Sequence, residues 1–309
     1  MWGHRLHEGW ALLKRTAHAF VRSDPFGQAG AIAYSTIFAL PAVLIITLVL
    51  ASLFYDPVEV RKALYDQAGS LIGMDTATSL REIVEHARHQ TSTVFARVVG
   101  IATLIFSATS VFMSVQGSLN RIWNVKPVPG RAIVKYFISR LLSLALIASF
   151  GFLLLVSLVI DAGLVAFGAR LEIWFPDFSV ILLAAANVLI SFLVIGVVFA
   201  LAFKLLPDAR VKWRDVRSGA LLTAVLFTAG KYLIGFYIGS THVDDAYGAA
   251  GTVIVILLWV YFSAVILLFG AQFTYQVAEQ SGRTIKPSEH AVVDHSKDPQ
   301  NRTDGTHQR

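Results

Sequence analysis

The sequence predicts an all-α polytopic membrane protein with six transmembrane helices. Of its 309 residues, 55% are hydrophobic and 15% are charged, and the mean hydropathy is +0.63. Soluble domains contain nearer a quarter charged residues, so this composition is typical of an integral membrane protein. No charged residue occurs between Asp245 and Glu279. That segment exceeds the roughly 20 residues with which a helix crosses a hydrocarbon core ~30 Å thick.

Six apolar segments meet this length criterion and form one transmembrane domain, residues 29–278. Pro41 removes a backbone donor within the first segment and should kink that helix. The fifth segment includes Lys231, because neither of its uncharged halves is long enough to span. The predicted spans are residues 29–54, 97–119, 137–160, 179–204, 217–239 and 248–277.

Three segments outside the predicted spans carry predictions of their own. Residues 1–28 repeat apolar side chains at helical spacing with basic ones between them, which predicts an interfacial helix at the inner membrane surface. A helix that docks a partner is the alternative. Between the first two spans, two short amphipathic patterns predict helices on the outer face, where a cap that gates a ligand is the alternative. Residues 279–309 are expected to form a disordered cytoplasmic tail.

Basic residues gather on one side of the predicted spans. By the positive-inside rule, this distribution places both termini in the cytoplasm. It also explains the net charge of +6 without nucleic acid as a partner, because the cations form a rim on one membrane face. The rim residues are Arg5, Lys14, Arg15, Arg22, Arg121, Lys126, Arg131, Lys135, Arg140, Lys204, Arg210, Lys212, Arg214, Arg217, Arg283 and Lys286.

Lys231 is the charged residue that the pattern places inside a span. It follows Arg217 by fourteen residues, which is about 20 Å of helix. An unpaired ammonium at this depth costs on the order of 3 kcal/mol, so we expect it to face a polar interior cavity open to the outer side, able to hold an anionic headgroup. A lysine that extends outward to the headgroups is the alternative. The candidate partners on this path are Asn187, Asp161, Asp244 and Asp245.

A second polar group is expected near the cytoplasmic ends of the first, second and sixth spans. Gln28, Gln116, Asn120 and Gln272 fall at similar depth there and could meet as an amide cluster. The alternative is that they only fix helix packing, because interhelical hydrogen bonds of about 0.6 to 2 kcal/mol are common in bundles.

Enzyme signatures are absent from the sequence. The chain has no cysteine, which excludes a disulfide framework and a thiolate site. His86 and His89 with Glu82 and Glu85 make only a weak metal pattern, and no phosphate-binding loop or hydrolase motif occurs. We therefore expect no catalytic residue, no metal and no cofactor.

Two fairly specific motifs resemble the YihY/BrkB family of bacterial inner-membrane proteins, formerly called ribonuclease BN. They are LNRIWNV at Leu119–Val125 and the pattern from Tyr247 through YFSA to GAQ at Gly270–Gln272. The resemblance covers residues 26–276. It implies six spans, cytoplasmic termini and residence in the bacterial cytoplasmic membrane. The family commonly has glutamate where Gln272 stands, so a proton-coupling carboxylate there would be missing from this chain.

Three functions follow in order of expectation. The first is a transporter or flippase-like protein for an anionic envelope lipid, because some relatives in that family are linked to envelope lipid export. The second is a structural membrane protein that organises a partner complex and transports nothing. An enzyme is the third, since a ribonuclease needs clustered histidines or carboxylates that RNA can reach. The expected partner is a membrane lipid. Nucleic acid is not an expected partner, and an oligomer is possible.

Overall fold

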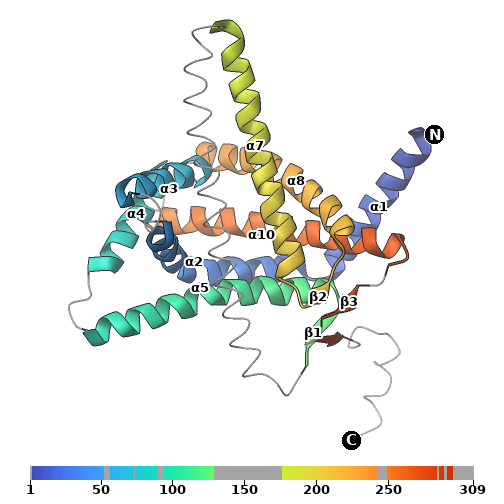
Figure 1. Cartoon of the computed structure of the whole chain (residues 1–309), viewed down its shortest axis with the longest axis horizontal. Helices are drawn as coiled ribbons and strands as arrows, with labels where there is room; N and C mark the ends of the chain where they lie inside the picture. The colour runs from blue at the N-terminus through green and yellow to red at the C-terminus, as the bar shows by residue number, and fades with distance from the viewer. Residues whose placement is uncertain are drawn as a thin grey trace, which may run out of the picture.

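The computed structural model describes residues 2–51, 56–72, 74–89, 94–128, 176–241, 249–283, 285–288 and 291–294 (Figure 1). Most of these residues are helical. The helices are α1 (Trp2–Arg22), α2 (Pro25–Ala51), α3 (Pro57–Ile72), α4 (Met74–His89), α5 (Val94–Ile122), α7 (Pro176–Leu205), α8 (Trp213–Thr241) and α10 (Ala249–Gln280). The short strands are β1 (Val125–Pro127), β2 (Ala209–Arg210), β3 (Lys286–Pro287) and β4 (Ala291–Val293).

Helix α10 lies at the centre of the bundle (Figure 1). It packs against α8 on one side and α2 on another, while α5 packs on α2 and α7 packs on α8. The helices α3 and α4 pack on each other near one end of α10, and the four strands lie near the opposite end (Figure 1). The bundle therefore has two different ends, and the strands mark the one at which α7 ends and α8 begins.

Helices α8 and α10 approach closely through a reciprocal pair of glycines and threonines. Gly219 of α8 faces Thr274 of α10, and Gly270 of α10 faces Thr223 of α8. Each threonine hydroxyl donates a hydrogen bond to the glycine carbonyl one turn earlier on its own helix, at 2.7 Å for Thr223 and 2.9 Å for Thr274. Small residues at such contacts let helix backbones come together in membranes.

The predicted interfacial helix was expected to run to residue 28, and this boundary is wrong. Helix α1 ends at Arg22, and α2 begins at Pro25. Asp24 lies between them with φ 51°, and its carboxylate accepts the Gly27 backbone N–H at 3.3 Å. An aspartate cap followed by proline at the first helical position is a strong start signal, and it begins a new helix here.

Three helices contain segments that are long and apolar enough to cross a membrane, among the residues described: Val188–Leu205, Trp213–Tyr237 and Gly251–Gln280. They correspond to the fourth, fifth and sixth predicted spans. Helices α2 and α5 occupy the first and second predicted spans. The third predicted span, residues 137–160, lies outside the described residues, so the count of six stays a prediction.

The tail was expected to be disordered, and its described part is not. Strand β3 pairs antiparallel with β2, with Arg210 opposite Lys286, and β4 pairs antiparallel with β1, with Val125 opposite Val293. The Lys126 ammonium lies 3.0 Å from a carboxylate oxygen of Asp294. These pairings place residues 285–288 and 291–294 against the end of the helix bundle.

Candidate functional site

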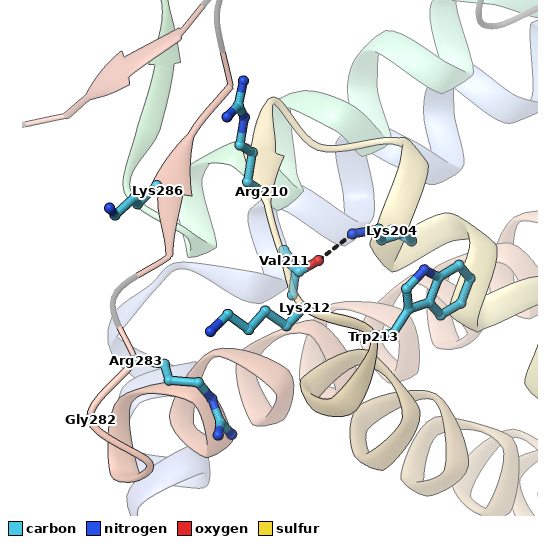
Figure 2. Close-up of a pocket in the computed structure, with 8 residues that line it drawn as sticks. All are labelled: Lys204, Arg210, Val211, Lys212, Trp213, Gly282, Arg283 and Lys286. Carbon is cyan, nitrogen blue, oxygen red and sulfur yellow. Dashed lines mark hydrogen bonds between the residues drawn. The ribbon is translucent and has the colours of Figure 1, made fainter.

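A pocket of about 680 Å³ opens where the tail meets the bundle (Figure 2). Eight of the described residues line it, and five of these are cationic: Lys204, Arg210, Lys212, Arg283 and Lys286. The other three are Val211, Trp213 and Gly282, so no carboxylate is among the described residues that line the pocket. We call this cavity the basic rim pocket. Its charge suits an anionic ligand.

Three separate parts of the chain supply these cations. Lys204 belongs to the last turn of α7, Arg210 and Lys212 belong to the connection into α8, and the remaining two follow α10. Gly282 has φ 65°, and the backbone N–H groups of Gly282 and Arg283 donate to the carbonyls of Glu279 and Ala278. This pattern is a Schellman turn, which ends the helix and redirects the chain. The turn brings the tail to the pocket.

One wall of the pocket is fixed by Lys204. Its ammonium donates to the Val211 carbonyl and lies 5.8 Å from the centroid of the Trp213 ring (Figure 2). Both acceptors are electrically neutral, so the positive charge of Lys204 is not cancelled by either contact. A cation above an indole face is attracted by the ring quadrupole. The contacts therefore orient Lys204 and keep its charge at the pocket.

A buried ion pair anchors the tail side of the pocket. The Arg283 guanidinium binds the Asp215 carboxylate, and the side chains are 25% and 3% exposed respectively. Asp215 lies in the first turn of α8, where the helix dipole favours a negative charge. The pair therefore joins the chain segment after α10 to the start of α8 and neutralises one of the five cations.

Lys212 and Lys286 are the cations most available to a ligand. Both residues are exposed, and neither side chain makes a hydrogen bond or ion pair with another described residue. They approach the pocket from different segments, one before α8 and one on β3 (Figure 2). An anion entering the pocket would meet these two ammonium groups first.

Asp208 clamps the connection between α7 and α8 onto α5. Its carboxylate accepts from Asn120 Nδ2 at 2.9 Å and from Gln116 Nε2 at 3.4 Å, and its backbone N–H donates to Asn120 Oδ1 at 2.8 Å. Its carbonyl accepts from the Ser288 N–H of the tail at 2.9 Å. The clamp holds the segment that carries Arg210 and Lys212. Two members of the predicted amide cluster thus meet, through an aspartate that the sequence reasoning missed.

The other two members of that predicted cluster do not join it. Gln28 is 5% exposed and its amide nitrogen donates to the carbonyls of Ser23 and Asp24, at the start of its own helix. Gln272 is also 5% exposed, on α10. No hydrogen bond links Gln28 to Gln272 in the part of the chain that the structure describes. Both amides are therefore buried, and the described hydrogen bonds of Gln28 are local to the start of α2.

Lys231 lies on the inward-facing side of α8. Ala224 lies seven residues before it, Phe227 four residues before it, and Ile234 three residues after it. At this spacing all four residues share one helix face. Ala224 is 0% and Ile234 is 7% exposed, and Phe227 packs on Phe199 with centroids 5.5 Å apart. Lys231 itself is half-buried. Its side chain makes no hydrogen bond or ion pair within the described residues.

The partners predicted for Lys231 are only partly placed. Asn187 belongs to α7, the helix that packs against α8, although its side chain is outside the description. Asp161, Asp244 and Asp245 lie outside the described residues. The outer polar path therefore stays a prediction. Of the five residues assigned to it, Lys231 is the one whose side chain the structure describes.

The weak metal pattern on α4 contains an ion pair instead. Arg81 Nε donates to Glu85 at 2.9 Å, and this hydrogen bond together with the glutamate charge raises the pKa of Arg81 above its ordinary value. The side chains of His86 and His89 are outside the description. Among the described residues, no group of three histidine, aspartate or glutamate side chains is placed to hold a metal ion.

All five cations of the basic rim pocket could be recognised in the sequence, but only as markers of membrane sidedness. Such residues stand at the ends of spans in most helical membrane proteins, so their positions alone do not distinguish a pocket from a rim. The sequence did show that Lys204 to Lys212 and Arg283 to Lys286 flank spans that must be neighbours. It did not show the turn at Gly282, which brings Arg283 and Lys286 to the other cations and so makes the pocket.

The helices and the pocket define a class: a helical membrane protein with a cationic cavity at one end of its bundle. Comparison with known families identifies it further. The model of the family described as "Virulence factor BrkB" matches residues 16–294, so the chain belongs to this family. The resemblance stated from the two sequence motifs is thereby confirmed.

Several bacterial membrane proteins are similar to this chain. A UPF0761 membrane protein of Stenotrophomonas maltophilia is 30% identical over 270 residues, which cover 84% of this chain and 59% of that protein. One from Pseudomonas paraeruginosa is 28% identical, covering 86% of this chain and 62% of its own length. One from Rhodospirillum centenum is 28% identical, covering 89% and 59%. The chain thus spans about three fifths of these relatives. No solved structure matches it.

Proposed function

We propose that this protein binds an anionic membrane lipid at the basic rim pocket and moves it across the membrane. The observation that carries the proposal is the convergence of five cations on one cavity at the end of apolar helices. A lipid headgroup and its acyl chains need a cationic site beside a hydrocarbon-facing surface. The pocket offers both, because Trp213 lines it and is 47% exposed at the start of an apolar helix.

Lys231 supplies a second cationic position on the same helix. It lies eighteen residues after Trp213, which corresponds to about 27 Å along α8. It is half-buried on the face that packs against neighbouring helices. A charge at this depth costs on the order of 3 kcal/mol unless a partner or water stabilises it, so a lipid phosphate passing along α8 would be attracted there.

Lipid exchange in reconstituted vesicles tests this proposal. The full chain is incorporated into vesicles with fluorescent phosphatidylglycerol, and the label exposed to an external quencher is followed with time. We expect faster exchange than in protein-free vesicles, and faster exchange for phosphatidylglycerol than for zwitterionic phosphatidylcholine. The variant Lys212→Ala/Lys286→Ala and the variant Lys231→Ala should each slow exchange at least tenfold, the effect of about 1.4 kcal/mol.

The exposed residue Lys62 on α3 provides the matched control, because Lys62→Ala removes a lysine far from the pocket in the fold. It should exchange lipid as the unaltered protein does. Exchange equal to that of protein-free vesicles, with phosphatidylglycerol still bound through the pocket, would contradict transport and favour a static lipid-binding role. If Lys231→Ala changes neither binding nor exchange, Lys231 is not on the path.

A further inference from the structure

We propose that the basic rim pocket selects anions that carry more than one phosphate group. This ligand class includes lipid headgroups with two phosphates and soluble polyphosphates. The inference rests on the proposed function and narrows the substrate of the same site. It follows from the number of cations, their separation around the cavity and the size of the cavity.

The charge of the pocket exceeds what one phosphodiester can balance. Arg283 is paired with Asp215, but Lys204 is held by a neutral carbonyl and a neutral ring. Lys212 and Lys286 make no hydrogen bond or ion pair with other described residues. A phosphodiester carries one negative charge, so it would leave at least two of these three ammonium groups without a counter-charge. A ligand with two phosphate groups would satisfy them more completely.

The cations surround the cavity instead of forming one cluster. Lys204 is at the end of α7, Lys212 precedes α8, and Lys286 is on β3 (Figure 2). A cavity of about 680 Å³ lies within the roughly 300 to 1,000 Å³ of pockets that enclose drug-sized ligands. It therefore has room for phosphates at two positions.

Competition between ligands of different charge tests the inference. In lipid nanodiscs, binding of phosphatidylglycerol is compared with binding of cardiolipin, which carries two phosphates. In detergent, calorimetry compares inorganic phosphate with pyrophosphate. We expect the ligand with two phosphates to bind at least tenfold more tightly in each pair. The variant Lys212→Ala/Lys286→Ala should abolish this preference, while Lys212→Arg/Lys286→Arg should retain it and Lys62→Ala should leave it unchanged.

The outcomes separate this inference from the proposed function. Equal affinity for both lipids, lost in the alanine variant, would contradict the selection of two phosphates and leave lipid binding intact. Preference for pyrophosphate without binding of either lipid would support the ligand class but overturn the lipid function. Binding that is absent, or that the alanine variant does not change in a protein with unaltered thermal unfolding, would overturn both.

Discussion

The contact between α8 and α10 makes a demanding prediction about Gly270. A Cβ added at this position would overlap Thr223 Oγ1, come within 3.0 Å of Thr223 Cβ and lie 3.2 Å from Phe203 Cζ. Thr223 is fully buried, and its hydroxyl is held by a hydrogen bond to the Gly219 carbonyl at 2.7 Å. Its side chain cannot turn away without breaking that bond, so Gly270→Ala should force α8 and α10 apart.

The expected cost comes from three contributions. Overpacking costs about 1 to 3 kcal/mol. Loss of the Thr223 hydrogen bond would add about 0.5 to 1.5 kcal/mol, and replacing a helical glycine by alanine returns about 0.5 to 1 kcal/mol. The net destabilisation should be about 0.5 to 4 kcal/mol. Thermal unfolding of the detergent-solubilised protein should therefore begin at least about 1 °C lower.

Gly235 on the partner helix α8 provides the control for Gly270→Ala. An added Cβ there meets nothing within 4 Å, so Gly235→Ala should leave the melting temperature unchanged or raise it. The double variant Gly270→Ala/Thr223→Gly should lose less stability than the sum of its single variants, because the two atoms that clash are gone. A Gly270→Ala protein as stable as Gly235→Ala would refute the close packing of these helices.

Two further predictions concern the clamp and the helix start. Asn120→Ala should destabilise the protein by about 1 to 3 kcal/mol, because it removes both hydrogen bonds between Asn120 and Asp208. Gln116→Ala should cost less, because the hydrogen bond from Gln116 to Asp208 is long, at 3.4 Å. Thermal unfolding of both variants measures the two losses, and equal losses would contradict the clamp. Asp24→Ala should lower the free energy of unfolding by about 0.5 to 2 kcal/mol, and Asp24→Gly by only a few tenths, because glycine accepts the positive φ of 51° at this cap. A larger loss for Asp24→Gly than for Asp24→Ala in the same assay would contradict the role of Asp24 as a helix cap.

The positions of several helices could be predicted from the sequence because apolar length is a strong signal. Helix α10, Ala249–Gln280, differs little from the predicted span 248–277. The break before α2 was also readable from the Asp24 and Pro25 pair, although the prediction passed over it. The paired strands could not be predicted, because two or three residues such as Lys286–Pro287 carry no periodicity and their partners are distant in the chain.

The candidate site was only partly readable for a related reason. The side of α8 on which Lys231 lies follows from helical spacing to neighbours such as Ala224. The basic rim pocket does not follow from spacing, because it depends on the turn at Gly282 and on the pairing of Arg210 with Lys286. The role of Asp208 was hidden in the same way, since its amide partners are on α5, far away in the sequence.

If the basic rim pocket holds an anionic lipid, that lipid should leave the membrane with the protein. The unaltered chain and its Lys212→Ala/Lys286→Ala variant are extracted gently from cell membranes, and the bound lipids are quantified by mass spectrometry. We expect anionic lipids to be enriched over the bulk membrane on the unaltered protein and reduced to the bulk proportion on the variant. Equal lipid composition on the two proteins would contradict it.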